Sequence, residues 1–326
     1  MIQENVPLAP YTTFKVGGLA RYFAEASTVE EIKELCSWAR SAVDGRVFAL
    51  GGGSNVLVSD SGFGGLVIRF CASDFKISED KIFAEAGASL GKIVFETASV
   101  GLSGLEWSVG IPGTIGGAIC DNTGAFAREM SELAESVEVL SLEDLSIKQF
   151  NKTDCGFSYR DSIFKKTGNF IILSAVLKLT EGNTDDVRER IKNYAVERAS
   201  SFIGAGQKCA GCFFKNVEWS RLCQENSLRK SDFRSMKEEV LQKFPELSQF
   251  SNKPKISAAF LIESVGLKGE KIGGAAVSDK HTNFLVNTGN ASAKDVRDLS
   301  NLVKEKILKK YGFNLEEEVV LVGFEK

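Results

Sequence analysis

The chain has 326 residues, of which 43% are hydrophobic and 25% charged, and its formal net charge is -3. This length predicts two or three domains with a substantial core, and the charge leaves no basic surface for nucleic acid or anionic lipid. Because no apolar run is as long as a membrane span and the N-terminus has no signal-peptide pattern, we expect a cytoplasmic protein that does not bind a membrane.

The N-terminal half predicts an α+β domain. One helix begins at Ser27 or Thr28, where a capping side chain precedes Glu30 and Glu31. A second helix covers 89–100 and stops at a glycine. Strands are predicted over 46–50, 57–58, 66–70, 81–86, 136–141, 145–151 and 169–179.

Two glycine-rich segments interrupt these elements. The strand at 46–50 runs into 51–55 (GGGSN), whose main-chain N–H groups and polar side chains can form an anion nest. The segment 104–117 repeats glycine at every third position around Pro112, which suits neither helix nor strand but lets the main chain approach a large planar or phosphorylated ligand. The dinucleotide fingerprint GxGxxG is absent. Two such loops indicate a diphosphate cofactor gripped from two sides, and a buried glycine-rich turn is the alternative.

The second half begins after a predicted charged helix from Asn183 to about Ala199. The small, polar segment 200–207 that follows indicates a domain boundary. Beyond it, helices are predicted within 218–243, after Ser257 and over 293–310, with strands at 284–287 and 319–322.

Several polar features are candidates for chemistry. Cys209 and Cys212 form a CxxC pair, but no second pair or histidine cluster completes a zinc site, so we expect no metal. Arg160 lies in a polar turn, where a surface ion pair is the simpler interpretation. Glu318 precedes an apolar strand, so alternation turns it inward while the adjacent glutamates face solvent. His281 is the single histidine and by default a satisfied polar loop residue.

These segments together resemble the UDP-N-acetylenolpyruvoylglucosamine reductase family, also called UDP-N-acetylmuramate dehydrogenase. The resemblance covers nearly the whole chain, and the segments follow the family's order. They are 12–18 (TTFKVGG), 50–57 (LGGGSNVL), 110–117 (GIPGTIGG), 159–164 (YRDSIF), 210–216 (AGCFFKN), 271–277 (KIGGAAV) and 315–319 (LEEEV).

The resemblance implies a fold and an activity. The fold is α+β: a two-lobed FAD-binding domain of the vanillyl-alcohol-oxidase (PCMH) type over 1–199, with lobes of about 1–66 and 67–199, and an α+β substrate-binding domain over 200–326. The activity is an FAD- and NADPH-dependent oxidoreductase that reduces UDP-N-acetylglucosamine enolpyruvate to UDP-N-acetylmuramate in peptidoglycan synthesis. Such an enzyme serves cell-wall biogenesis, cell shape and cell division, and we expect a cytoplasmic monomer with small-molecule partners.

The resemblance also implies roles for single residues. Hydride passes from flavin N5 to the vinyl carbon, and Arg160 and Glu318 stabilise the charge left on the adjacent carbon and carboxylate. Cys212 stands where the family carries a proton-donating serine. The substrate contacts are Tyr159, Lys215, Asn216, Lys255 and His281. FAD is held by Gly51, Gly52, Gly53, Ser54, Asn55, Gly110, Ile111, Pro112, Gly113, Thr114, Gly116 and Gly117.

Cysteine in place of serine is the main departure from the family. A thiol, with an ordinary pKa of about 8.5, is a far stronger acid than an alcohol, so proton donation remains chemically sensible. Our hypothesis is that a disulfide between Cys209 and Cys212 would remove the donor. Phe126 and Phe250 stand where relatives carry tyrosine, so contacts made through those hydroxyls are lost.

Two alternatives stay open. One is an FAD-dependent oxidase of a small alcohol or sugar acid on the same fold; Lys255 and Glu318 count against it, as does the lack of histidine in the FAD lobes. The other is a flavoprotein that binds a nucleotide sugar but lost catalysis when cysteine replaced serine.

Overall fold

The computed structural model describes residues 1–201, 206–225 and 233–324. A four-stranded mixed sheet forms the first lobe, in the order β1 (Gln3–Pro7), β2 (Leu19–Ala26), β5 (Phe63–Phe70) and β3 (Val47–Leu50). β1 is antiparallel to β2, whereas β2 and β3 run parallel to β5. Between β2 and β3, α1 (Val29–Ala42) begins at a capping box of Thr28 and Glu31 and packs its apolar face on the sheet.

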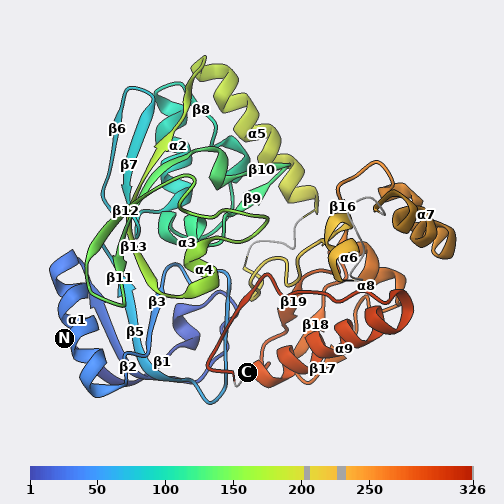
Figure 1. Cartoon of the computed structure of the whole chain (residues 1–326), viewed down its shortest axis with the longest axis horizontal. Helices are drawn as coiled ribbons and strands as arrows, with labels where there is room; N and C mark the ends of the chain where they lie inside the picture. Colours follow the sequence, from blue (N-terminus) through green and yellow to red (C-terminus); the bar gives the residue numbers. More distant parts are fainter. Residues whose placement is uncertain (202–205, 226–232, 325–326) are drawn as a thin grey trace.

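A five-stranded antiparallel sheet forms the second lobe. Its order is β12 (Ile147–Asn151), β11 (Ala134–Ser141), β13 (Phe170–Lys178), β7 (Lys81–Glu85) and β6 (Phe75–Ser78). One apolar core joins this sheet to α2 (Leu90–Ser99), α3 (Ile115–Cys120) and α5 (Thr184–Ser201), which Figure 1 shows beside it. The shorter elements are η1 (Ala9–Tyr11), β8 (Leu102–Ser103), η2 (Glu106–Ser108), β9 (Gly124–Ala125), β10 (Arg128–Glu129), η3 (Met130–Glu132), α4 (Ile163–Thr167) and β14 (Thr180–Glu181).

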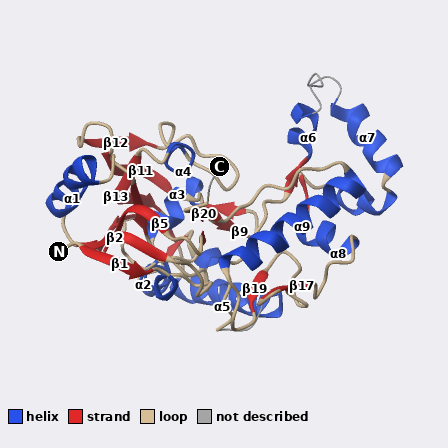
Figure 2. Ribbon diagram, turned by 90° about the horizontal axis from the view of Figure 1, so that it is seen from below, coloured by secondary structure: helices blue, strands red, loops and turns tan. Residues whose placement is uncertain are grey.

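The C-terminal domain is built around its longest helix, α9 (Ala293–Tyr311). Val296, Leu299, Val303 and Ile307 follow the three- and four-residue spacing of one helical face and enter the core of this domain. Its other elements are β15 (Val217–Glu218), α6 (Trp219–Glu225), α7 (Phe233–Lys243), η5 (Pro245–Phe250), β16 (Lys255–Ile256), α8 (Ala258–Ser264), β17 (Lys271–Ile272), β18 (Ala275–Val277) and β19 (Leu285–Asn287). Figure 2 shows α6 and α7 at the end of the molecule away from the two lobes.

The last strand returns to the first lobe. β20 (Val320–Val322) pairs in parallel with β4 (Val56–Val58), and the Val320 N–H donates to the Asn55 carbonyl at 3.0 Å. Phe14 and Val16 of the first lobe in turn belong to the apolar core of the C-terminal domain. The chain thereby brings the glutamates at 316–318 next to the glycine loop at 51–55.

The predicted helices and strands are present in the structure, and one difference lies near Gly65. A strand was predicted there over 66–70, and the first lobe was expected to end near residue 66. In the structure β5 runs from Phe63 through Phe70, so the first sheet continues past that boundary. A Cβ on Gly65 would lie 2.3 Å from the Arg46 carbonyl oxygen, so this glycine permits close strand contact. β1 was not predicted.

The predicted domain boundary at 200–207 lies largely outside the described residues, and the division at residue 199 remains a prediction. No described helix is long and apolar enough to cross a membrane. Among the described residues, no group of three or more His, Cys, Asp or Glu side chains could hold a metal ion.

Candidate active site

An ion pair between distant parts of the chain forms the centre of the site. Arg160 lies in the turn before α4, and Glu318 lies just before β20. Arg160 Nε is 2.8 Å from Glu318 Oε1, and the side chains are 18% and 19% exposed. The Arg160 guanidinium also donates to the Gly124 carbonyl. Glu318 therefore points inward as predicted, whereas the surface ion pair considered for Arg160 is wrong.

The glutamates before Glu318 were expected to face solvent, and this is wrong for Glu317, which is 17% exposed, whereas Glu316 is 40% exposed. Glu317 Oε1 lies 2.6 Å from Arg297 Nη1 and 2.9 Å from Lys304 Nζ, both on α9. Glu316 pairs with Arg221 of α6. Strand alternation predicts that Glu318 points inward. It does not predict that helices of the C-terminal domain place cations beside the two glutamates before it.

Burial controls the protonation of the central pair. It raises the pKa of Glu318, against the opposing charges of Arg160 and Lys165. Burial also disfavours the charge on Arg160, but the combined effect of Glu318, Tyr159 and Cys212 raises its pKa. The site thus holds a permanent cation beside a carboxyl group that accepts a proton more readily than an exposed one.

Cys212 belongs to the same cluster. Glu318 and Arg160 both act electrostatically on its thiol, and the Asn283 side chain hydrogen-bonds it. Burial, the largest effect, raises the pKa of Cys212 to about 12, so the sulfur keeps its proton at neutral pH. Cys209 and Cys212 are both free thiols, and their disulfide stays a prediction.

Asn283 fixes the segment that carries Cys212. Its side-chain oxygen accepts from the Phe214 N–H at 2.9 Å, and its side-chain nitrogen donates to the Phe214 carbonyl at 2.8 Å. Its own carbonyl accepts from the Phe213 N–H at 2.7 Å. Sequence analysis did not identify Asn283, which lies two residues after His281.

Three of the predicted substrate residues meet beside the central pair. Lys255 Nζ lies 2.9 Å from the centre of the Tyr159 ring, a cation–π contact. The Tyr159 hydroxyl accepts from the Asn216 N–H at 3.4 Å, and the Asn216 side chain accepts from the Ala258 N–H. Burial raises the pKa of Tyr159 to about 12 and lowers that of Lys255.

Of the other two predicted substrate residues, Lys215 adjoins Asn216 in the chain, whereas His281 contacts Ser278 and Phe284 of its own loop. Lys215 Nζ is 3.7 Å from Glu316 Oε2 and 4.0 Å from Asp161 Oδ2. His281 packs edge-on against Phe284, and burial lowers its pKa, so its ring is neutral at pH 7. Among the described residues, its buried Nδ1 atom has no hydrogen-bond partner.

The two glycine loops face one another as predicted. A Cβ on Gly52 would lie 2.9 Å from Gly113 Cα, so neither position has room for a side chain. Ser54 Oγ donates to the Pro112 carbonyl at 2.9 Å, which joins the loops directly. No described residue accepts a hydrogen bond from the main-chain N–H of Gly52, Gly53 or Ser54, so these donors suit an anionic group.

Several main-chain N–H groups of the loop at 110–117 are used within the protein. The N–H groups of Ile115 and Gly116 donate to the carbonyls of Ala88 and Ala86. The Gly117 N–H donates to Thr114 Oγ1, the N-cap of α3. The N–H groups of Ile115, Gly116 and Gly117 are therefore not free to bind a ligand. This part of the loop lets a ligand approach closely but does not donate hydrogen bonds to it.

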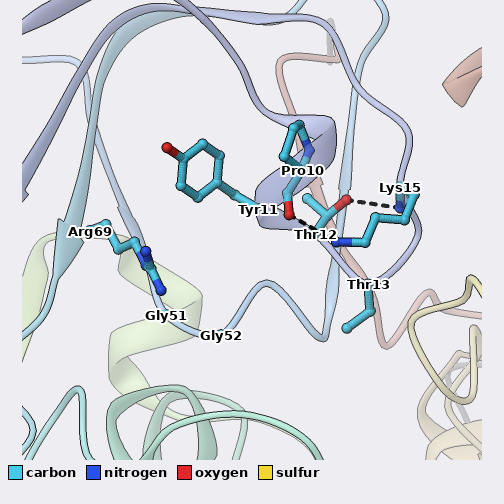
Figure 3. Close-up of a pocket in the computed structure, with 8 residues that line it drawn as sticks. All are labelled: Pro10, Tyr11, Thr12, Thr13, Lys15, Gly51, Gly52 and Arg69. Atoms are coloured by element: carbon cyan, nitrogen blue, oxygen red, sulfur yellow. Dashed lines mark hydrogen bonds between the residues drawn. The ribbon is translucent and has the colours of Figure 1, made fainter. Parts of the chain in front are cut away.

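A cavity of about 320 Å³ opens beside Gly51 and Gly52. Figure 3 shows Arg69 and Tyr11 on one side of it and Lys15 on the other, where Lys15 Nζ donates to the Pro10 carbonyl at 2.8 Å. Its remaining lining residues are Thr12 and Thr13. Apart from Gly51 and Gly52, sequence reasoning gave none of the lining residues a role, although the segment 12–18 was among those that matched the family.

Two further charges beneath Glu318 were also missed. Lys165 Nζ lies 2.8 Å from Asp121 Oδ1, and each side chain is 15% exposed. In the sequence, Lys165 is the first of two lysines after an apolar pair, and nothing distinguishes it from a surface residue.

Opposed glycine loops, a cavity at one of them and an enclosed arginine–glutamate–thiol cluster are the features that the resemblance to a flavin-dependent oxidoreductase led us to expect. In agreement, residues 20–144 match the FAD binding domain family. Residues 204–322 match the family described as UDP-N-acetylenolpyruvoylglucosamine reductase, C-terminal domain.

Comparisons over the full length give the family. The chain is 34% identical to the UDP-N-acetylenolpyruvoylglucosamine reductase of Synechococcus sp. (strain WH7803), over 100% of this chain and 94% of the relative. It is 35% identical to the reductase of Caldicellulosiruptor saccharolyticus, over 98% of this chain and 91% of the relative. The crystal structure of the reductase from Thermus caldophilus matches 99% of this chain and 100% of its own, with 33% identity and a TM-score of 0.75. The chain belongs to the UDP-N-acetylenolpyruvoylglucosamine reductase family.

Proposed function

We propose that the protein is the FAD-dependent enzyme that reduces UDP-N-acetylglucosamine enolpyruvate to UDP-N-acetylmuramate with NADPH, in peptidoglycan precursor synthesis. The observation that carries this proposal is the enclosed Arg160–Glu318 pair beside the protonated thiol of Cys212. A reduction of an enolpyruvyl double bond needs these elements: a cation for developing charge and an acid for the final proton.

The two glycine loops and the cavity beside them suit the cofactor. Gly52, Gly53 and Ser54 offer main-chain donors for a pyrophosphate, and Gly113 lets the second loop approach from the other side. We assign the cavity lined by Tyr11 and Arg69 to the adenosine end, where an aromatic ring and a cation are available. FAD held there would supply the hydride chemistry, between NADPH and the terminal vinyl carbon of the substrate.

Arg160 and Glu318 would act on the charge that develops in the substrate. After hydride addition, negative charge spreads from the adjacent carbon into the substrate carboxylate. The guanidinium stabilises that charge because it is held in place, enclosed and always protonated. Glu318 orients the guanidinium, and its raised pKa favours the protonated form that can donate to the substrate carboxylate.

Cys212 would deliver the proton. Its raised pKa keeps the thiol protonated before the reaction, so it does not repel the anionic intermediate. The S–H bond breaks as the new C–H bond forms on the substrate carbon, and Arg160 lies near enough to stabilise the thiolate left behind. Solvent restores the proton before the next turnover.

The group formed by Tyr159, Asn216 and Lys255 would bind the UDP-sugar. The Lys255 ammonium is a compact charge suited to a diphosphate. Lys215 and the neutral ring of His281 are further proposed contacts. With small molecules as its partners, we infer that the enzyme acts as a cytoplasmic monomer, a state that light scattering would measure.

Separate measurement of the two half-reactions tests the function. Under anaerobic conditions, NADPH should bleach the yellow flavin, and UDP-N-acetylglucosamine enolpyruvate should then restore the colour. Rapid reoxidation by oxygen but not by this substrate would indicate an oxidase instead. Bleaching that this substrate cannot reverse would mean that the protein has lost the reductase reaction.

A further inference from the structure

A closed set of polar contacts lies beneath the Arg160–Glu318 pair. The Lys165 ammonium, 2.8 Å from Asp121 Oδ1, also donates to the main-chain carbonyl of Glu318 at 2.8 Å. The Asn55 side-chain amide donates to Asp121 Oδ2 at 2.8 Å and to the same carbonyl at 3.2 Å. Lys165 and Asn55 therefore each connect the Asp121 carboxylate to the main chain of Glu318.

The four residues come from four separate segments of the site. Asn55 ends the loop at 51–55, and Asp121 caps the end of α3, whose beginning belongs to the loop at 110–117. Lys165 lies on α4, directly after the turn that carries Arg160. Glu318 is held from its other side as well, because its N–H donates to the Phe213 carbonyl at 2.8 Å. The contacts thus tie Glu318 to both glycine loops and to the Cys212 segment.

The enclosure of these charges needs an explanation. A buried lysine–aspartate pair gains little net stability, because desolvation offsets most of the attraction. Asn55 was predicted to contribute its side chain to the cofactor site, but its side-chain amide donates to Asp121 and to the Glu318 carbonyl. A role in fixing geometry accounts for both observations.

We propose that Lys165 and Asp121 are positioning residues for Glu318: with Asn55, they fix its carbonyl relative to both glycine loops and so hold its carboxylate against Arg160. This inference deepens the proposed function and rests on it for its kinetic consequence. It assigns no contact with substrate to either residue.

The charge pair also acts on the Glu318 carboxyl group, in opposite directions. Lys165 lowers the pKa of Glu318, and Asp121 raises it. The charged or titratable groups that face Glu318 are Arg160, Lys165, Asp121, Tyr159, Cys212 and Lys255. Removing one charge at a time should therefore shift the titration of Glu318 upward for Lys165→Met and downward for Asp121→Asn.

Infrared difference spectroscopy of the FAD-bound protein measures this titration without turnover, and Glu318→Gln identifies the carboxyl band. We expect opposite shifts for the two single variants and a return toward the wild-type value for the double variant Lys165→Met/Asp121→Asn. The matched control is the exposed pair of Lys178 and Asp80, whose charged atoms are 3.6 Å apart. Lys178→Met and Asp80→Asn should leave the band unchanged. Shifts in the same direction, or none, would overturn the proposal.

The kinetic readout separates positioning from general stability. Both single variants should bind FAD and accept hydride from NADPH as the wild type does, but should lose at least tenfold in the rate of flavin reoxidation by substrate. Equal losses in both half-reactions would overturn the positioning role. If the wild type itself fails to be reoxidised by the substrate, the proposed function fails, whereas the infrared titration still tests the network.

Discussion

Arg160 combines a proposed catalytic side chain with a strained backbone. Its φ is +55°, a left-handed conformation that costs a non-glycine residue about 1–3 kcal/mol and that persists only where surrounding contacts enforce it. Here the contacts are the Gly124 carbonyl and the Glu318 carboxylate. Arg160, Glu318 and Cys212 could be predicted from their motifs. Lys165 and Asp121 could not, because their importance arises only when α3 and α4 meet the C-terminal strand.

The thiol of Cys212 should remain protonated well above the ordinary range for cysteine. Because burial raises its pKa to about 12, proton donation should not decline as pH rises through about 8.5, where an exposed thiol ionises. The rate of flavin reoxidation by substrate and the rate of Cys212 alkylation, followed from pH 7 to about 10, should show no transition from this group. A transition near pH 8.5 in both that disappears in Cys212→Ser would contradict the raised pKa.

Among the elements, the positions of the two glycine loops were predicted correctly, but the hydrogen bonds that their groups make were not. The sequence identifies 51–55 and 110–117 as loops because their glycine spacing suits no regular element. It cannot show that Ser54 donates to Pro112 or that the carbonyls of Ala88 and Ala86 accept from the N–H groups of Ile115 and Gly116. Those contacts depend on how the lobes pack, which is a long-range property.

Gly52→Ala should separate the two loops and weaken FAD binding. A Cβ at this position would meet Gly113 Cα at 2.9 Å, and overpacking of this kind costs about 1–3 kcal/mol, or roughly 5- to 150-fold in the FAD dissociation constant. Flavin fluorescence measures that constant. Gly64→Ala is the matched control, because its Cβ would meet only the flexible end of Arg46 at 3.6 Å. Equal affinity in the two variants would show that the loops do not need this close approach.

Glu106 should anchor α5 to the second lobe in a pH-dependent manner. Its nearly buried carboxylate accepts from Ser103 Oγ at 2.7 Å, the Gly104 N–H at 2.6 Å and Arg190 Nε of α5 at 3.0 Å. Although burial alone would raise its pKa, these hydrogen bonds lower it. A lowered pKa in the folded state means that the carboxylate stabilises the fold at neutral pH and that this contribution is lost as the pH falls through the acidic range.

The corresponding change is Glu106→Gln. It should lower the free energy of unfolding by about 1–3 kcal/mol at pH 7, because a charged acceptor is lost, and by less at acidic pH. Urea unfolding at several pH values measures this difference. Glu135→Gln removes an exposed partner of Lys81 and should unfold like the wild type. A loss for Glu106→Gln that does not shrink toward acidic pH would contradict the proposed origin of the stability.

On the scale of the whole molecule, the local elements were largely predictable and their assembly was not. Apolar periodicity and capping residues gave most helices and strands, such as α2 and α9. The parallel pairing of β20 with β4 joins residues more than two hundred positions apart, and no local pattern encodes it. That pairing brings Glu318 to Arg160, so the site is a product of the final fold.

Cys212 is proposed to supply the proton to the substrate carbon. Stopped-flow absorbance of Cys212→Ala without oxygen, with each half-reaction followed separately, tests this role most directly. We expect flavin reduction by NADPH at nearly the wild-type rate and reoxidation by UDP-N-acetylglucosamine enolpyruvate slower by roughly 10²–10⁴-fold, the contribution typical of a general acid. Reoxidation at the wild-type rate, or equal loss of both half-reactions, would contradict it.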